Sequence, residues 1–480
     1  MHIDLAGLLL TGIIVANVIF AVVIVFVDRK RPAEMLAWLL LFAFLPVVGF
    51  LLFMLFGQKF FMRRRSRLLR HEGYRRLVQT LERQAAEVDV AQARGEHLDP
   101  PADVVARLHH SRTGAPITYG NAVTIFTHGT EKFAALLRDI EAAEESIHLE
   151  YFIWRPSSVG KELTQALTRK AAEGVAVRVV LDDWGCKLTP QRLFKDLTAA
   201  GGKVVRFLPV NFATSFNANY RNHRKLAIID GRIGYVGGMN VGDEYLDGRA
   251  DLSPFRDTHL RVAGPAVWRL QARFIMDYTF ASGEEVPIQE AWLAPPPAGD
   301  VALQMVFSGP DADEQYIRNG FLKMIQLARD RLWIQTPYLV PDEPVLEALK
   351  LAAYAGVDVR IMLPGVANNP IVHRVTLAYA AELLQAGVRV WEYDGFLHSK
   401  AILCDDAVLS IGTTNMDVRS FALNFEANAF IYDAGKVREF AAAYEDDLSV
   451  SRELTWERYA AQGYPARVLE GLFRLLAPLL

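Results

Sequence analysis

The chain has 480 residues and a formal net charge of −3, and this length allows two or more domains. The slight acidic excess argues against a general nucleic-acid-binding protein, which would carry a basic excess. Two cysteines are too few for a disulfide framework and fit a reducing compartment. The mean hydropathy of +0.13 is high for a soluble enzyme, and the apolar excess is concentrated in the first 57 residues.

Two long apolar runs account for this excess. Residues 5–27 form a run that is long enough to cross a bilayer core of about 20 helical residues. Residues 35–56 form a second uncharged run, which Pro46 and Gly49 interrupt. A cleaved signal peptide is disfavoured because no basic residue precedes the first run and its apolar core is too long. We expect either two transmembrane helices or a helical hairpin that enters and leaves one leaflet.

Basic residues flank these runs and predict their orientation. Three lie in the short loop between the runs, at Arg29, Lys30 and Arg31, and favour the opposite orientation to the eight that follow the second run. Eight follow the second run, at Lys59, Arg63, Arg64, Arg65, Arg67, Arg70, Arg75 and Arg76. The larger group is expected on the cytoplasmic side, which places the rest of the chain in the cytoplasm. The same group can also hold the protein against anionic lipid, at about 1 kcal/mol per basic residue.

The body that follows contains two halves with the same order of predicted elements. Helix, strand, helix and strand are expected at 133–140, 146–153, 161–173 and 174–181, and again at 321–328, 331–338, 345–355 and 356–363. The last strand of each half opens on the pattern G-V-x-V-R, which marks a duplication. This alternation predicts an α/β fold with largely parallel, buried strands.

The boundaries of these regions follow from composition. We predict a membrane segment (1–58), a basic juxtamembrane helical linker (59–118), a first half (119–293), a second half (300–456) and an amphipathic tail (457–480). A proline-rich stretch at 294–299 separates the halves. The tail has two open interpretations, a helix packed on the body or a helix lying on the membrane surface.

Each half carries one copy of the pattern H-x-K-x4-D, followed by G-x-x-N. The first copy comprises His223, Lys225, Asp230 and Asn240, and the second comprises His398, Lys400, Asp405 and Asn415. With eleven His in the chain, chance supplies on the order of a few hundredths of one such match. The two copies therefore indicate a shared chemical role.

The spacing of the motif explains that role. Residues i and i+2 of a strand point to one face, so each His projects beside its Lys. Two such units give two imidazoles and two cations around one small anion, and Asn240 and Asn415 can add amide donors. This predicts a phosphate site with a nucleophile and a general acid. Asp230 and Asp405 complete the candidate catalytic motif, but position i+7 lies on the opposite strand face, so we expect them to act structurally.

The paired motifs resemble those of the phospholipase D superfamily, and the apolar N-terminus and the tail are similar to those of its bacterial cardiolipin synthases. The resemblance implies two phospholipase D-like halves with pseudo-twofold symmetry and one site between them. It also implies a two-step exchange that needs neither a metal nor a cofactor. His223 would be the nucleophile that forms a phosphohistidine, and His398 the general acid and then the base. Acidic residues past the motifs, Asp257 and Glu426, would orient the His rings, although ordinary strand-end salt bridges would explain them too.

The resemblance further implies a phosphatidyltransferase that converts two phosphatidylglycerol molecules into cardiolipin and glycerol. Two alternatives stay open: a membrane-bound phospholipase D that uses water, and transfer from phosphatidylethanolamine. Asn368, Asn369 and Thr413 depart from the family pattern and leave the donor and the alcohol undecided. The expected partners are phosphatidylglycerol, cardiolipin and an anionic membrane rather than nucleic acid, and a homodimer is left open. The expected location is the bacterial cytoplasmic membrane, crossed more than once, with the catalytic body in the cytoplasm.

Overall fold

The computed structural model describes residues 5–26, 32–53, 100–210, 219–246 and 252–461, together with Gln79, Leu98, Gly463, Glu470, Gly471, Phe473 and Arg474. The chain forms two compact units. One contains Met1–Arg67 and Pro209–Tyr220, and the other contains Leu68–Leu208 and Arg221–Leu480. Most of the predicted juxtamembrane linker and its basic residues lies outside the described residues, as does most of the predicted tail.

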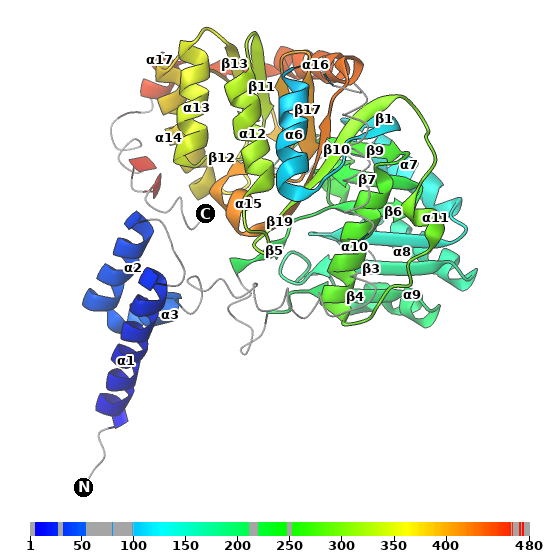
Figure 1. The fold of residues 1–480 in the computed structure, drawn as a ribbon, viewed down its shortest axis with the longest axis horizontal. Helices are drawn as coiled ribbons and strands as arrows, with labels where there is room; N and C mark the ends of the chain where they lie inside the picture. Colours follow the sequence, from blue (N-terminus) through cyan, green and yellow to red (C-terminus); the bar gives the residue numbers. More distant parts are fainter. Residues whose placement is uncertain are drawn as a thin grey trace. The chain divides into compact units, whose positions relative to one another are not determined.

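The described residues of the N-terminal unit include the helices α1 (Leu5–Phe26), α2 (Pro32–Phe44) and α3 (Pro46–Leu52), drawn in blue in Figure 1. In the described part of the chain, one helix is long and apolar enough to cross a membrane, over Gly7–Phe26. The second apolar run is two short helices, because Pro46 lacks a backbone N–H and its ring clashes with the preceding turn. The expectation of two transmembrane helices or a hairpin in one leaflet stays a prediction.

The three helices pack on one another through aromatic side chains. Ile24, Phe42 and Phe53 form a small buried cluster, and the rings of Phe20 and Phe53 lie 4.7 Å apart. The side-chain amide nitrogen of Asn17 has a partner inside this unit, since it donates to the carbonyl oxygen of Pro46 at 2.8 Å. A polar group in apolar surroundings needs such a partner.

The second unit is built on one large mixed sheet with the strand order β20-β14-β13-β11-β16-β17-β19-β10-β1-β9-β7-β6-β2-β3-β4. The strands of the first half are β1 (Thr118–Phe126), β2 (Ser146–Tyr151), β3 (Ala176–Asp182), β4 (Lys203–Phe207), β6 (Leu226–Ile229), β7 (Ile233–Gly237) and β9 (His259–Ala263). Those of the second half are β10 (Val301–Ser308), β11 (Arg331–Gln335), β13 (Asp358–Pro364), β14 (Arg389–Tyr393), β16 (Ala401–Cys404), β17 (Val408–Gly412), β19 (Asn424–Ile431) and β20 (Ser451–Leu454). The two half-sheets join where β1 pairs antiparallel with β10.

Along the main strand order of the large sheet, parallel pairing is confined to one stretch in each half. In the first half β2 pairs parallel with β3 and β3 with β4, and in the second half β11 pairs with β13 and β13 with β14. The strands around the motifs are antiparallel, because β6–β7 and β16–β17 are hairpins, and a short turn can join only antiparallel strands. The duplicated α/β fold is confirmed, but the prediction of a largely parallel sheet was wrong.

Helices cover both faces of the sheet in each half. The helices of the first half are α7 (Gly129–Glu141), α8 (Ser158–Ala172), α9 (Lys195–Ala199), α10 (Val267–Ser282) and α11 (Glu290–Leu293). Leu149 of β2 is buried with α7 and α8, whereas the neighbouring His148 stacks on Phe274 of α10 at 4.7 Å. Successive strand residues point to opposite faces, so α10 lies across the sheet from α7 and α8 (Figure 1).

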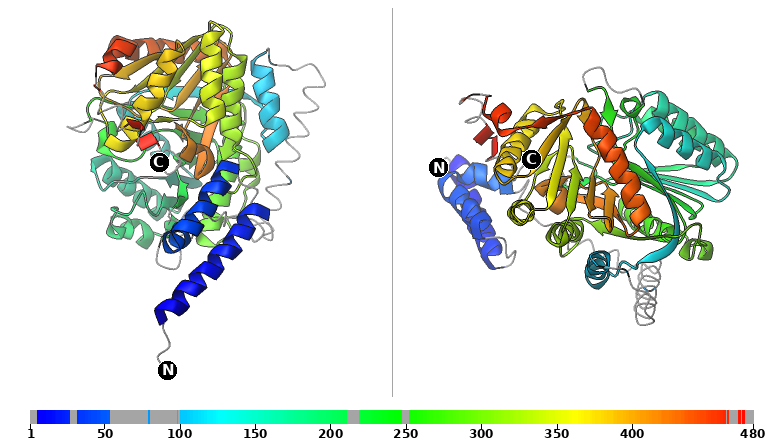
Figure 2. Two further views of the ribbon diagram at one scale, coloured as in Figure 1. Left: turned by 90° about the vertical axis from the view of Figure 1, so that its left-hand side faces the viewer. Right: turned by 90° about the horizontal axis from the view of Figure 1, so that it is seen from above.

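The second half repeats this arrangement. Its helices are α12 (Tyr316–Leu327), α13 (Glu343–Tyr354), α14 (Pro370–Gln385), α15 (Val418–Ala422) and α16 (Ala434–Ser449). Leu332 of β11 is buried with α12 and α13, and the neighbouring Trp333 stacks on Tyr444 of α16 at 5.1 Å. Figure 2 shows α16 across the sheet from α12 and α13. The repeated layers give the two halves their pseudo-twofold relation.

Short elements complete the second unit. They are α6 (Ala102–Thr113), α17 (Trp456–Ala460), β5 (Arg221–Asn222), β8 (Phe255–Arg256), β12 (Leu339–Val340), β15 (Phe396–Leu397) and β18 (Met416–Asp417). The described tail residues contact the body: Arg474 donates to Glu382 of α14 at 2.6 Å, and Phe473 packs near Val375. Among the described residues, the tail thus packs on α14.

Candidate active site

Each catalytic motif begins at a short strand that pairs with the opposite half. His223 directly follows β5, which pairs parallel with the start of β19, and its backbone N–H donates to the Phe425 carbonyl oxygen at 3.0 Å. His398 directly follows β15, which pairs parallel with β8, and its N–H donates to the Arg256 carbonyl oxygen at 2.6 Å. This crossed pairing holds both His residues at the junction of the halves.

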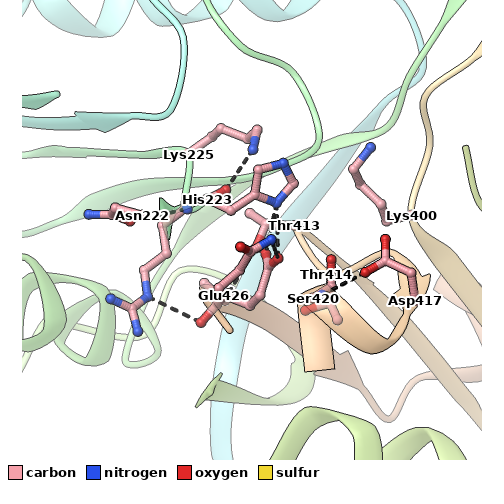
Figure 3. A network of polar contacts seen from close by, with 12 residues as sticks. Asn222, His223, Lys225, Lys400, Thr413, Thr414, Asp417, Ser420 and Glu426 are labelled. Atoms are coloured by element: carbon pink, nitrogen blue, oxygen red, sulfur yellow. Dashed lines mark hydrogen bonds and ion pairs between the residues drawn. The ribbon is translucent and has the colours of Figure 1, made fainter. Parts of the chain in front are cut away.

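The carboxylates that contact the two imidazoles are also crossed. Nδ1 of His223 lies 3.0 Å from Oε1 of Glu426, in the second half (Figure 3). Nδ1 of His398 lies 2.6 Å from Oδ2 of Asp257, in the first half. An ionised carboxylate only accepts hydrogen bonds, so Nδ1 of each ring carries the proton and Nε2 holds the lone pair. Each His is therefore oriented by an acid that belongs to the other motif's half.

The surroundings of both rings favour the neutral imidazole. Burial lowers the pKa of His223, which the Glu426 carboxylate raises and the Lys225 and Lys400 charges lower further. Burial and the Lys400 charge lower the pKa of His398 to about 4, against the opposing effect of Asp257. A neutral imidazole with a free Nε2 can act as a nucleophile or a base. An entering phosphodiester adds a negative charge, which raises both pKa values and allows one ring to hold a proton.

Lys225 and Lys400 directly precede β6 and β16, outside the strands on which the i, i+2 argument relied, and each contacts the backbone of its own His residue. Nζ of Lys225 donates to the His223 carbonyl oxygen at 2.6 Å, and Nζ of Lys400 donates to the His398 carbonyl oxygen. Figure 3 shows the two ammonium groups on either side of the His223 ring. Burial lowers the pKa of Lys225 to about 7 and that of Lys400 to about 8. The Lys400 charge also lowers the pKa of Lys225, so the two buried cations repel each other and favour an anion nearby.

The side chains of the two motif Asn residues form hydrogen bonds with other residues of the protein. Oδ1 of Asn240 accepts from the Ile153 N–H at 3.1 Å, and its Nδ2 donates to the Tyr245 hydroxyl at 3.0 Å. The side chain of Asn415 bonds to the carboxylate of Asp417. The structure therefore places both amides next to the motifs, but uses their donors to hold neighbouring residues.

Asp230 and Asp405 lie in the turns after β6 and β16, both with φ near +50°. The Asp230 carboxylate accepts from the backbone N–H groups of Glu145 and Ser146, each at 2.8 Å. Asp405 accepts from Asp330 and Arg331 at 2.9 and 3.0 Å. Each carboxylate thus ties a motif hairpin to the start of the neighbouring strand, β2 or β11. Both Asp residues lie in the hairpin turns rather than on the strand face that the opposite-face argument assumed.

Thr413 and Gly238 occupy the second position of the two G-x-x-N patterns. Thr413 bonds to Glu426, and Gly238 leaves room for Asp257. The Thr413 hydroxyl donates to Oε2 of Glu426 and accepts from the Ala427 N–H at 2.9 Å. At Gly238 a Cβ would lie 2.0 Å from Oδ1 of Asp257. The sequence identified Thr413 only as a departure from the family pattern.

Two buried ion pairs lie at the junction of the two halves, and the sequence analysis did not predict them. Arg224 donates to Asp277 at 2.6 Å and to the Glu426 carbonyl oxygen at 3.1 Å. Arg256 donates to Asp447 at 3.0 Å. Both arginines directly flank a catalytic or orienting residue, and this position was the only signal in the sequence. Across the described residues, no group of three or more His, Cys, Asp or Glu side chains could hold a metal ion.

Comparison with known proteins agrees with this geometry. The model of the family "Cardiolipin synthase, PLD-like domain" matches residues 136–255 and 321–449, and that of "Phospholipase_D-nuclease N-terminal" matches 15–58. The structure is similar to a phosphatidylserine synthase of Haemophilus influenzae, with a TM-score of 0.60 and 15% identity over 78% of this chain and 98% of that one. The fold and the paired motifs thus define a phospholipase D-like protein.

Relatives over the whole length narrow this class. The chain is 41% identical to a cardiolipin synthase of Oceanobacillus iheyensis, over 99% of this chain and 100% of the relative. It is 40% identical to the major cardiolipin synthase of Bacillus subtilis, with the same coverage. The chain belongs to the cardiolipin synthase family.

Proposed function

We propose that this protein transfers a phosphatidyl group from one phosphatidylglycerol to a hydroxyl of a second, which gives cardiolipin and glycerol. The observation that carries the proposal is the crossed pair of His–carboxylate contacts at the junction of the halves, with the charges of Lys225 and Lys400 close to His223. Relatives named cardiolipin synthase that align from end to end support the choice of lipid.

The first step forms a phosphohistidine. Nε2 of His223 attacks phosphorus, and the bond from phosphorus to the glycerol oxygen breaks. The proton that His398 holds once the anionic substrate is bound passes to that oxygen, so glycerol leaves as a neutral alcohol. The Glu426 carboxylate stabilises the charge that develops on His223, and Lys225 and Lys400 stabilise the phosphoryl oxygens.

The second step reverses the roles. His398 is now neutral and takes the proton from the incoming hydroxyl, whose oxygen attacks phosphorus. The phosphorus–nitrogen bond breaks and its electron pair returns to Nε2 of His223. Cardiolipin is released, and both rings regain the state that they had at the start of the first step, with the proton again on His398.

The location follows from the same proposal. We place α1 in the bacterial cytoplasmic membrane and the catalytic body on its cytoplasmic side, as the basic residues after the second apolar run predict. The short helices α2 and α3 suit a segment that enters and leaves one leaflet.

Product analysis tests the proposal. Purified full-length protein is incubated with phosphatidylglycerol vesicles, and lipids and free glycerol are measured by mass spectrometry. We expect cardiolipin and glycerol in equal amounts. Phosphatidic acid as the sole lipid product would identify a hydrolase instead. Vesicles that also contain phosphatidylethanolamine test the other donor, because its use releases ethanolamine.

A further inference from the structure

The loop that follows β3, residues 183–190, exposes two large apolar side chains. Trp184 is 47% exposed and Leu188 is 79% exposed. Nζ of Lys187 lies 4.4 Å from the centre of the Trp184 ring, and the Arg221 guanidinium lies 5.2 Å from it. Tryptophan beside basic residues is the combination found where proteins meet the headgroup region of a bilayer.

This loop is held firmly to the nucleophile. The Asp182 carboxylate accepts from the Gly185 N–H and from the Asn222 N–H, both at 2.8 Å, and Asn222 directly precedes His223. The Phe152 ring lies 5.1 Å from the His223 ring. At Gly185 a Cβ would lie 2.1 Å from the Phe152 carbonyl oxygen, so the loop packs directly on this residue. Because the loop and His223 are held rigidly together, the depth to which the loop enters a bilayer fixes the depth of His223 relative to that bilayer.

The second half has a loop at the equivalent place, after β13. Its side chains include Ile371, which is 40% exposed at the start of α14. Nδ2 of Asn368 donates to the Tyr338 hydroxyl at 2.7 Å, and Leu339 begins β12, which pairs with β18 directly after Asn415. Both loops thus follow the carboxyl ends of parallel strands, next to one of the two H-x-K-x4-D motifs. Open α/β sheets place their ligand sites at these ends.

We propose that residues 183–190 contact the phospholipid bilayer directly, with Trp184 and Leu188 inserted at the boundary between headgroups and acyl chains. The proposal rests on the proposed function, because both substrates are then lipids whose acyl chains stay in the bilayer. Their phosphates lie at the headgroup level, only a short distance from this boundary. A loop that inserts to the boundary brings His223 to the level of the phosphate, whereas a membrane helix alone would tether the body without orienting it.

The chain offers a matched control position. Leu351 is 63% exposed near the end of α13, and β13 begins shortly afterwards at Asp358. A helix between parallel strands runs back from their carboxyl ends to their amino ends, so Leu351 lies at the sheet edge away from the catalytic motifs. Both cysteines of the chain are buried, which leaves an introduced exposed cysteine as the reactive one.

Fluorescence of labelled full-length protein tests the contact. Leu188→Cys and Leu351→Cys are each labelled with a polarity-sensitive fluorophore and reconstituted into phosphatidylglycerol–phosphatidylcholine vesicles. We expect the label at 188 to be quenched by a spin-labelled acyl chain and protected from iodide, and the label at 351 to show the reverse. Equal iodide quenching at both positions, or lipid quenching at both, overturns the proposal.

An activity ratio separates this proposal from the proposed function. Leu188→Asp and Leu351→Asp are compared on vesicles and on short-chain phosphatidylglycerol below its aggregation concentration. For Leu188→Asp we expect the ratio of vesicle to monomer activity to fall at least fivefold, and for Leu351→Asp to stay at the wild-type ratio. An unchanged ratio in Leu188→Asp overturns the bilayer contact. A wild type that forms no cardiolipin from either substrate overturns the proposed function instead.

Discussion

His223 and His398 have equivalent contacts but different acids, and this difference bears on their roles. Glu426, beside His223, also accepts from the Thr413 hydroxyl and from the Asn424 amide at 3.3 Å. Asp257, beside His398, accepts from the Thr258 N–H at 2.7 Å. Since three donors hold Glu426 as an ionised acceptor, His223 has the environment that best stabilises a lasting positive charge, as a phosphohistidine requires.

His223→Ala is expected to abolish both cardiolipin formation and the covalent intermediate, because no other described side chain replaces its Nε2. His398→Ala is expected to retain slow formation of the adduct, because the attacking nitrogen is still present. Acid-quenched enzyme incubated with labelled phosphatidylglycerol and digested to peptides measures this directly. An adduct on the peptide that contains His398 would reverse the two roles.

Glu426→Gln is expected to lower the transfer rate roughly 10²–10⁴-fold, because an amide keeps the size of the side chain but cannot stabilise the imidazolium charge. Thr413→Ser is the matched control, since it keeps the hydroxyl that donates to Glu426, and we expect it to stay within a few-fold of wild type. Initial rates on phosphatidylglycerol vesicles compare the two. Equal losses in both variants would mean that packing, rather than charge, is what Glu426 supplies.

The pKa values of Lys225, lowered to about 7, and of Lys400, lowered to about 8, predict that activity falls along the alkaline limb of the pH–rate profile. A lysine loses its charge as the pH rises through its pKa, so attraction for the phosphate weakens from about pH 7 upward. We expect KM to rise along this limb more than kcat falls. Lys225→Arg should move the limb to higher pH, because the guanidinium stays charged. A limb at the wild-type pH in this variant would remove Lys225 from phosphate binding.

At the scale of single elements, the local patterns were sufficient to predict β2, β3, β11 and β13 and the helices between them. The second apolar run showed its break at Pro46, but its division into two short helices needed the structure. The pairings of β5 with β19 and of β15 with β8 could not be predicted. Each involves two residues whose partners lie more than 140 positions away, and Arg221–Asn222 alone has no strand pattern.

The same limit applies to the acids. Position along the chain singled out Asp257 and Glu426, but the assignment of each acid to the opposite His depends on those long-range pairings. The two Asn residues were predicted as phosphate donors from their type alone. The structure shows that a neighbour such as Tyr245 can take the same donor, which no local pattern reveals.

The turn residues Asp230 and Asp405 support a stability prediction. Replacing either by Ala removes the acceptor of at least two backbone N–H groups, one or more of them at least half-buried, and is expected to cost about 1–3 kcal/mol of folding free energy. Asp230→Asn is expected to cost less, because asparagine tolerates the left-handed backbone and keeps one acceptor oxygen. Thermal unfolding of the purified variants in detergent checks this order. A larger loss in Asn than in Ala would contradict the capping role.

At the scale of the whole molecule, the crossed pairing makes the halves dependent on each other. Each half supplies the acid and the short strand that position the other half's His, so neither half alone contains an oriented imidazole. The catalytic rings are nearly closed off, with 10% of the His223 side chain and 12% of the His398 side chain exposed. A phosphohistidine in this position must still meet a second lipid before it meets water.

Removal of residues 1–57 tests whether membrane attachment keeps water away from the phosphohistidine. Lipid hydroxyls are concentrated at the bilayer surface and water is scarce there, so seating on the membrane favours transfer over hydrolysis. We expect the truncated protein to form less cardiolipin on vesicles and a larger share of phosphatidic acid, because these residues contribute positioning but no catalytic group. Full-length protein on the same vesicles is the control, and both lipids are measured together. An unchanged ratio of cardiolipin to phosphatidic acid would mean that the burial of His223 and His398 within the catalytic body excludes water by itself.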